Sequence, residues 1–235
     1  MKIVSSFSPN HSKKARSVRD IKHVIIHYTG MQSEIASIKR LKDPMHKVSC
    51  HYLINRDGEV IQMVKDKNIA WHAGKSKWKK FNGLNKSSIG IELVNKGHRF
   101  GYQNYSNRQI KSLIKLCKIL KKKYFISKDN FLGHSDIAPL RKEDPGEKFP
   151  WKRLSYQNLG RWFKSHKKNV RLKTKNIETL FFKNLKKLGY RYFNVYKRKS
   201  TDKKIVKSFQ QHYLPSNVTG KIDKKTHQIS HFLTN

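Results

Sequence analysis

The stretch Val24-Ile25-Ile26-His27-Tyr28-Thr29-Gly30 starts with three β-branched apolar residues and ends in polar ones. Short apolar runs of this kind are typical of strands buried on both faces of a sheet. His27 therefore comes at the carboxyl end of a buried strand, where its side chain can face a cleft. Residues 49–54 and 88–94 are similarly apolar and predict two further strands.

Turn and helix signals surround these strands. The Asp57-Gly58 pair predicts a turn, after which residues 59–64 return as the second arm of a hairpin. Residues 106–123 predict the clearest helix, because Ser106 and Gln109 fit a capping box and apolar residues recur at helical spacing behind them. Strands that alternate with helices indicate an α/β domain.

A second, smaller unit follows. Apolar residues recur at helical spacing over 180–188 and 205–213, and residues 222–226 open a last short helix. We therefore predict an α/β domain over 1–165, a basic linker over 166–175 and a small all-α domain over 176–235.

The charge of the chain is extreme, with 53 Lys and Arg against 15 Asp and Glu and a net charge of +38. Such a field attracts nucleic acid, anionic lipid or an anionic polymer. No nucleic-acid-binding motif accompanies it, and the lysines are scattered along the chain. A lysine-rich composition of the source genome would produce the same charge.

The chain offers few signals about its location. No apolar stretch is long enough to cross a bilayer, and residues 1–8 hold one lysine and no apolar segment of signal-peptide length. Cys50 and Cys117 do not make a disulfide framework and are predicted as small core residues. We expect a cytoplasmic protein, with a periplasmic or wall-associated one as the alternative. The oligomeric state stays open.

The second informative stretch is Gly133-His134-Ser135-Asp136-Ile137-Ala138-Pro139-Leu140-Arg141-Lys142-Glu143-Asp144-Pro145-Gly146. His134 and Asp144 are two metal-ligand types that one loop can fold onto a single ion, and Lys142 lies between them in the sequence. With His27 they make two histidines and one carboxylate, which leaves a fourth position for water. That set is typical of a hydrolytic zinc site, so the first hypothesis is a Zn²⁺ metallohydrolase.

These residues also carry a family resemblance. HYTG, SCHYLINRDGEV, AWHAGKS, SIGIELVN and GHSDIAPLRKEDPGEKFPW follow one another in the order found in AmpD/AmiD-type zinc-dependent N-acetylmuramoyl-L-alanine amidases, which they resemble. The resemblance implies a central mixed β-sheet flanked by helices. It also implies cleavage of the amide between N-acetylmuramic acid, ordinary or 1,6-anhydro, and the L-alanine of the peptide stem. Peptidoglycan or its fragments would then be the partner.

The resemblance assigns the metal ligands to His27, His134 and Asp144. The C-terminal pieces LKKLGY, IVKSFQQHYL and TGKIDKKT are similar to the three-helix peptidoglycan-binding module of wall hydrolases, with a plain helical appendage as the alternative.

Glu92 and Lys142 are the predicted catalytic residues. Period-two alternation in Ile89-Gly90-Ile91-Glu92-Leu93 places Glu92 opposite the apolar side chains, where a carboxylate is costly without a partner. The alternatives are a structural salt bridge for Glu92 and a solvated surface position for Lys142. The resemblance implies that Glu92 is the general base and that Lys142 stabilises the oxyanion.

Four further residues are predicted to contact substrate: Trp71, His72, Asn95 and Arg141. Trp71 and His72 match a family block that lines the substrate groove, and Arg141 resembles a residue near the carboxylates of the stem peptide. His51 is predicted as a packed strand histidine.

Three other protein classes compete with this interpretation. A non-catalytic peptidoglycan-recognition protein would lack the metal ligands, which are all present here. A phage endolysin would share the chemistry, but its T7-like branch carries a cysteine ligand eight residues after the second histidine, where this chain has Lys142. A basic nucleic-acid-binding protein would explain the charge alone.

Overall fold

The computed structural model describes residues 2–164 and 176–234. Its centre is a six-stranded sheet. In order across the sheet, the strands are β1 (Ile3–Ser5), β5 (Val60–Gln62), β4 (Tyr52–Ile54), β9 (Ser88–Leu93), β3 (His23–Tyr28) and β10 (Phe131–Gly133). The β4–β5 pair is the predicted antiparallel hairpin, and the other neighbours run parallel. The sheet is therefore mixed, as predicted.

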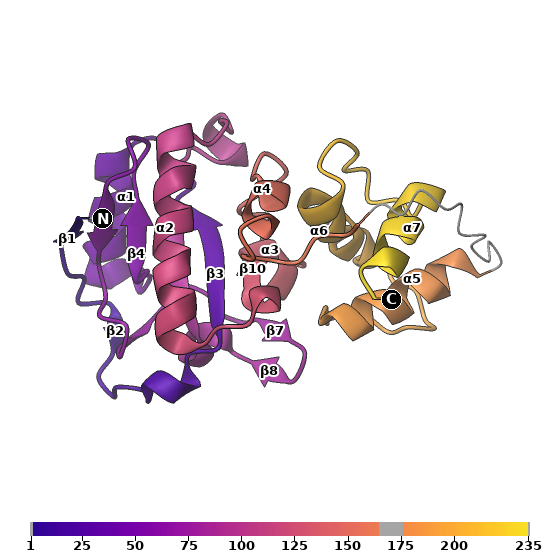
Figure 1. Cartoon of the computed structure of the whole chain (residues 1–235), viewed down its shortest axis with the longest axis horizontal. Helices are drawn as coiled ribbons and strands as arrows, with labels where there is room; N and C mark the ends of the chain where they lie inside the picture. The colour runs from indigo at the N-terminus through magenta and orange to yellow at the C-terminus, as the bar shows by residue number, and fades with distance from the viewer. Residues whose placement is uncertain (1, 165–175, 235) are drawn as a thin grey trace.

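Helix α2 (Asn107–Tyr124) covers one face of this sheet (Figure 1). Its apolar stripe packs into a core that includes Val24 and Ile26 of β3. The Ser106 side chain caps the helix by accepting from the backbone N–H of Gln109. Gln109 does not return that bond: its amide donates to the Ile54 carbonyl at 2.9 Å. Only the first half of the predicted capping box forms, because the Gln109 side chain is buried against the sheet.

Strand alternation decides which side chains reach the other face. On β3, Val24 and Ile26 point toward α2, whereas Ile25 packs in a different core cluster. His27 shares the side of Ile25, since it is two residues further along the strand. The parallel pairing of β3 with β9 sets His27 beside Glu92. The face away from α2 therefore carries the polar residues of the central strands.

The other face is covered by shorter elements. Helix α1 (Glu34–Lys42) packs Leu41 into a small cluster with Cys50 and Leu53. Two small two-stranded ribbons, β2 (His11–Ser12) with β6 (Ile69–Ala70) and β7 (Lys77–Trp78) with β8 (Phe81–Asn82), complete the domain.

The C-terminal helices lie beyond the β10 edge (Figure 1). They are α5 (Ile177–Leu188), α6 (Asp202–Tyr213) and α7 (Lys224–Phe232), and the short helices α3 (His134–Ile137) and α4 (Trp151–Ser155) lie between them and the sheet. Phe181 and Phe209 share one buried cluster with Ile25 and Leu132 of the sheet. The predicted linker over 166–175 lies outside the described residues, and the division into two domains stays a prediction.

Asp136 of α3 connects this helical unit to the sheet. Its carboxylate accepts from the Tyr190 hydroxyl at 2.5 Å, the His212 Nδ1 at 2.8 Å and the Gly133 backbone N–H at 2.8 Å. Asp136, Tyr190 and His212 are buried, and the His212 ring stacks on Trp151. Hydrogen bonds to a buried carboxylate are strong, so they fix α3 against the C-terminal helices.

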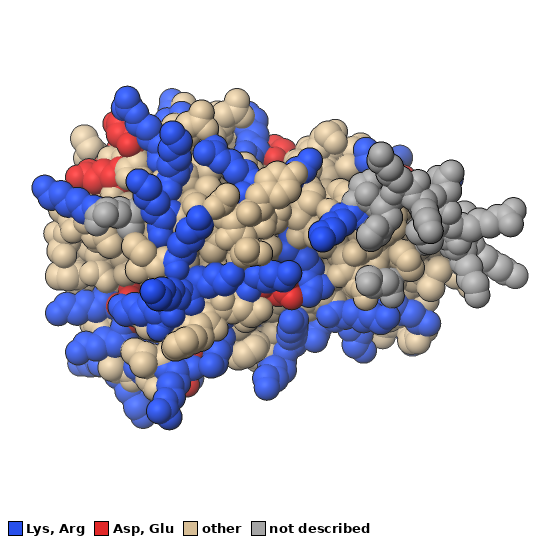
Figure 2. All heavy atoms as spheres, in the orientation of Figure 1, with Lys and Arg blue, Asp and Glu red and all other residues tan. Residues whose placement is uncertain are grey.

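Among the described residues, Lys and Arg are spread over the face seen in Figure 2 and form no single stripe on it. This scatter is what a lysine-rich composition produces. In the described part of the chain, no helix has the length and apolar character needed to span a membrane.

A second buried carboxylate ties α2 to the sheet. Asp66 accepts from the hydroxyls of Tyr52 at 2.6 Å and Tyr124 at 2.5 Å, and from the Lys123 ammonium at 3.0 Å. Burial opposes its ionisation, but the bonds from Tyr124, Tyr52 and Lys123 outweigh burial and hold the pKa of Asp66 below its ordinary value.

We expect Asp66→Asn to lower the free energy of unfolding by about 2 kcal/mol at pH 7, because hydrogen bonds to a charged group are lost. A carboxyl whose folded pKa is lowered stabilises the protein above its unfolded pKa of about 3.9, and that stability is lost as the pH falls below it. The difference between the two proteins in urea unfolding should therefore shrink below pH 4. A difference that stays constant down to pH 3 would contradict this account.

Candidate metal and active site

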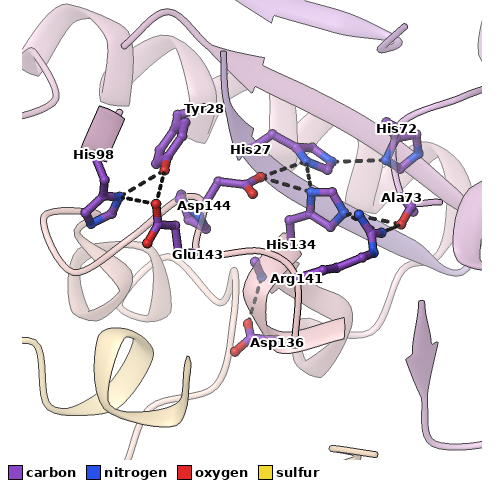
Figure 3. Close-up of polar contacts among 12 residues, drawn as sticks. His27, Tyr28, His72, Ala73, His98, His134, Asp136, Arg141, Glu143 and Asp144 are labelled. Carbon is purple, nitrogen blue, oxygen red and sulfur yellow. Dashed lines mark hydrogen bonds and ion pairs between the residues drawn. The ribbon is translucent and has the colours of Figure 1, made fainter. Parts of the chain in front are cut away.

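Three of the predicted residues converge at the carboxyl ends of β3 and β10 (Figure 3). The Nδ1 atoms of His27 and His134 lie 2.9 Å apart. The Asp144 Oδ2 lies 3.0 Å from the first and 3.1 Å from the second. All three residues are buried, and together they form a group that can hold a metal ion. β3 supplies His27, α3 supplies His134 and the loop after α3 supplies Asp144.

A chain of hydrogen bonds fixes the tautomer of His27. The Ser88 hydroxyl donates to the Leu84 carbonyl at 2.6 Å, so toward His72 it acts as an acceptor. His72 Nε2 must then carry the proton in its 3.2 Å bond to Ser88. Its Nδ1 is left as the acceptor for His27 Nε2, 3.0 Å away. His27 Nδ1 consequently presents a lone pair to the triad.

The outer nitrogen of His134 also faces an acceptor. His134 Nε2 lies 3.2 Å from the Ala73 carbonyl, which can only accept, and 3.2 Å from Arg141 Nη2, which can only donate. A metal ion bound at His134 Nδ1 would place the proton on Nε2, toward the Ala73 carbonyl. A backbone carbonyl bound to the outer nitrogen is the arrangement usual for metal-ligating histidines.

Three potential ligand atoms thus face one another at 2.9–3.1 Å. Burial lowers the pKa of His27 to about 4, and His134 adds to the effect, so His27 is neutral near pH 7. Burial opposes ionisation of Asp144, but the neighbouring His134 outweighs burial and holds the pKa of its carboxyl far below the ordinary value. Tetrahedral ligands at about 2.1 Å from an ion lie roughly 3.4 Å apart. The observed separations are slightly shorter, so a small outward movement of the side chains admits a divalent metal ion.

Glu92 and Lys142 line the same cleft as the triad, which has a volume of about 830 Å³. The Glu92 Oε2 is buried and has no hydrogen-bond partner among the described residues. Burial raises the pKa of Glu92 to about 8; Asp144 adds to the rise and Lys142 opposes it. An unpartnered carboxylate oxygen beside a metal-ligand triad indicates a site for chemistry rather than a structural ion pair.

The four residues predicted to contact substrate have different surroundings. His72 and Arg141 line the cleft, whereas Trp71 and Asn95 are not among its lining residues. His72 buttresses His27, and the Arg141 guanidinium donates to the carbonyls of Ala73 and Lys75.

Asn95 instead organises a loop. Its amide donates to the Gln103 carbonyl, and its side-chain oxygen accepts from the backbone N–H groups of Gly97 and Gln103. Trp71 donates through its indole to the Ser12 hydroxyl. A substrate contact by either residue stays a prediction.

Sequence reasoning missed several residues at the site. Tyr28, His98 and Glu143 form a polar cluster beside the triad, with 2.9 Å between the Tyr28 hydroxyl and His98 Nδ1 (Figure 3). Asp136 lies two residues from His134 inside the quoted loop, but nothing in its spacing pointed to partners on distant helices. His51 is buried, as predicted, but it lies directly before β4 rather than in a strand, and it accepts from the Gly90 backbone N–H.

Comparison with known proteins identifies the family. The model of the Amidase_2 family, described as N-acetylmuramoyl-L-alanine amidase, matches residues 17–147. The chain belongs to this amidase family. The matched segment contains all three residues of the triad together with Glu92 and Lys142, so the resemblance noted in the sequence is confirmed.

Individual relatives extend the match beyond that segment. The Escherichia coli N-acetylmuramoyl-L-alanine amidase AmiD is 34% identical over 229 residues, which cover 91% of this chain and 82% of AmiD. The Haemophilus influenzae 1,6-anhydro-N-acetylmuramyl-L-alanine amidase AmpD is 34% identical over 61% of this chain and 85% of AmpD. Similarity to AmiD therefore extends into the C-terminal helices, whereas similarity to AmpD covers a shorter part.

A solved structure supports the same assignment for the fold. E. coli AmiD, in complex with the substrate anhydro-N-acetylmuramic acid-L-Ala-D-gamma-Glu-L-Lys, superposes with a TM-score of 0.80 at 30% identity and covers 94% of this chain and 91% of that one. The predicted mixed sheet flanked by helices is thus confirmed as the fold of this amidase family.

A substitution at Gly90 would test how far metal binding depends on His72. A Cβ at position 90 would lie 2.4 Å from the His72 Cγ, and the glycine has no left-handed backbone that would itself strain an alanine. Gly90→Ala should therefore displace His72 and release the outer nitrogen of His27. We expect a ten- to hundredfold loss of metal affinity, the effect typical of losing such a partner.

Competition with a chelating dye would measure that affinity. Ile91→Val, on the opposite face of the same strand, is the matched control and should bind metal as the natural protein does. Circular dichroism would show that the variant is folded. Unchanged affinity in folded Gly90→Ala would contradict the buttressing role of His72.

Proposed function

We propose that the chain is a zinc-dependent amidase that hydrolyses the amide between N-acetylmuramic acid, ordinary or 1,6-anhydro, and the L-alanine of the peptide stem. The observation that carries the proposal is the convergence of His27 Nδ1, His134 Nδ1 and Asp144 Oδ2 beside the unpartnered Glu92 carboxylate. The family membership and the substrate bound by E. coli AmiD support the choice of bond.

The ligand set favours zinc among divalent ions, since two imidazoles and one carboxylate with an open position make a common catalytic zinc site. A zinc ion held there would lower the pKa of a water toward about 7 and polarise the amide carbonyl.

The protein's own groups then move the protons. Glu92 takes a proton from the attacking water and returns it to the amine that leaves with the peptide. Its pKa, raised to about 8 by burial, makes it a better proton acceptor than an ordinary glutamate once it is ionised, and a metal ion bound at the triad would favour the ionised form. Lys142 lines the cleft and supplies a positive charge to the tetrahedral oxyanion. No organic cofactor is needed.

The biological setting is part of the proposal. We infer a role in turnover or recycling of peptidoglycan, with a phage-type endolysin as the alternative. The buried triad argues against a non-catalytic wall-binding protein, because such a protein needs no metal ligands. The cytoplasmic location and wall binding by the C-terminal helices stay predictions.

Zinc binding should be visible without any substrate. Protein stripped with a chelator should gain about 4 kcal/mol of stability when zinc is present at a thousand times its dissociation constant. His134→Ala should lose this gain, because one of three ligands is gone. A thermal shift assay measures both. An equal gain in His134→Ala would mean that zinc binds elsewhere.

Glu92→Gln tests the chemistry separately from the metal. The amide keeps the shape of the side chain but cannot take up a proton, so we expect kcat to fall by about 10²–10⁴ with zinc content unchanged. Mass spectrometry of anhydro-N-acetylmuramic acid-L-Ala-D-γ-Glu-L-Lys would follow release of the free tripeptide. If the zinc-loaded natural protein releases none from this compound or from intact sacculi, the amidase proposal fails.

A further inference from the structure

Helix α6 forms one wall of the catalytic cleft, although it comes from the C-terminal unit. Lys204, Lys207 and Gln211 line the cleft together with the triad. Their spacing of three and four residues places them on one face of the helix. Residues such as Ile205 and Phe209 turn the other face into the core cluster shared with the sheet. Packing therefore fixes which face of α6 looks into the cleft.

The cleft holds more positive than negative side chains. Its cationic lining residues are Arg40, Arg99, Arg141, Lys142, Lys204 and Lys207. Over residues 2–164 and 176–234, none of these six forms an ion pair with a carboxylate.

None of the three carboxylates that line the cleft pairs with one of these cations. Asp144 belongs to the triad, where its Oδ2 lies 3.0 and 3.1 Å from the two histidine Nδ1 atoms, and Glu143 lies 3.5 Å from His98 Nδ1. The Glu92 Oε2 is buried and has no partner among the described residues. An anionic ligand in the cleft would therefore find cations that no protein carboxylate has neutralised.

The lysine-rich composition alone leaves many lysines of this chain without acidic partners. An unpaired lysine therefore indicates a binding site only where the structure holds it at the cleft. Lys204 is held at the cleft, because its ammonium donates to the Leu140 carbonyl at 3.2 Å. Leu140 belongs to the loop that joins His134 to Asp144. Lys207 is exposed one turn further along the same face. The pair thus presents two positive charges at the wall beside the metal loop.

We propose that Lys204 and Lys207 form a subsite for the carboxylates of the peptide stem. This inference rests on the proposed amidase function and names the part of the substrate that α6 recognises. The tripeptide L-Ala-D-γ-Glu-L-Lys carries two free carboxylates, one on the γ-linked glutamate and one at its end. Contacts with these groups hold the stem along α6 while the amide lies at the triad.

The test compares Lys204→Gln/Lys207→Gln with the natural protein on anhydro-N-acetylmuramic acid-L-Ala-D-γ-Glu-L-Lys and on the same compound with both carboxylates amidated. Exposed ion pairs are individually weak, so we expect KM for the free acid to rise about three- to tenfold with kcat unchanged. Amidation should raise KM of the natural protein by a similar factor and leave the variant nearly unaffected. KM should also depend less on salt in the variant.

Two controls separate the subsite from the general field. Lys111→Gln/Lys115→Gln removes two exposed charges from α2, on the far face of the sheet, and should leave KM unchanged. Lys204→Arg/Lys207→Arg keeps the charges and should keep most of the affinity. An equal loss in the α2 variant, or an equal loss on the amidated compound, would overturn the subsite.

Calorimetry with the free tripeptide keeps this test independent of turnover. Binding to the natural protein that weakens in Lys204→Gln/Lys207→Gln would support the subsite even if no cleavage were seen, a result that would reject only the amidase. Cleavage with the same KM in both proteins would reject the subsite and leave the amidase intact.

Discussion

The parallel pairing of β3 with β9 is the constraint on which the site depends. It sets His27 beside Glu92, and strand alternation turns both away from the apolar core under α2. A shift of one residue in either strand would bury the polar side chain in that core and expose an isoleucine to the cleft. The hydrophobic free energy of burying β3 and β9 against α2 therefore also fixes the position of a metal ligand and of the proposed base.

Through the hydrogen-bond chain behind His27, a backbone carbonyl determines which nitrogen of His27 carries the proton. The hydrogen-bond chain begins at the Leu84 carbonyl, passes through Ser88 and His72, and ends at the Nδ1 lone pair of His27. Each link has one possible direction once the carbonyl is fixed as an acceptor. Burial lowers the pKa of His72 well below its ordinary value, so the ring stays neutral and keeps its acceptor nitrogen. Gly90 leaves the space that the ring needs.

The sequence predicted the sheet, helix α2 and the triad because each depends on local pattern or on quoted motifs. Periodicity placed Glu92 opposite Ile91, and the structure agrees. Contacts between segments distant in the sequence could not be predicted, because the pattern of one segment does not show which other segment it will contact. The bonds from Asp136 to His212 and Tyr190 are of this kind. Gln109 shows a further limit: its motif predicted a capping bond, but burial gave its amide two carbonyls of the sheet instead.

The C-terminal helices do more than follow the amidase domain in the chain. They share a buried cluster with β3 and β10, and Asp136 links them to the helix that begins at His134. A tethered binding module would need only a linker, whereas here the free energy of packing α5 and α6 also holds α3 in place. Because the contact is apolar and buried, movement of α6 relative to the metal loop would expose that surface to water. Whatever α6 contributes to recognition is therefore held rigidly beside the reacting bond, which keeps the entropic cost of binding low.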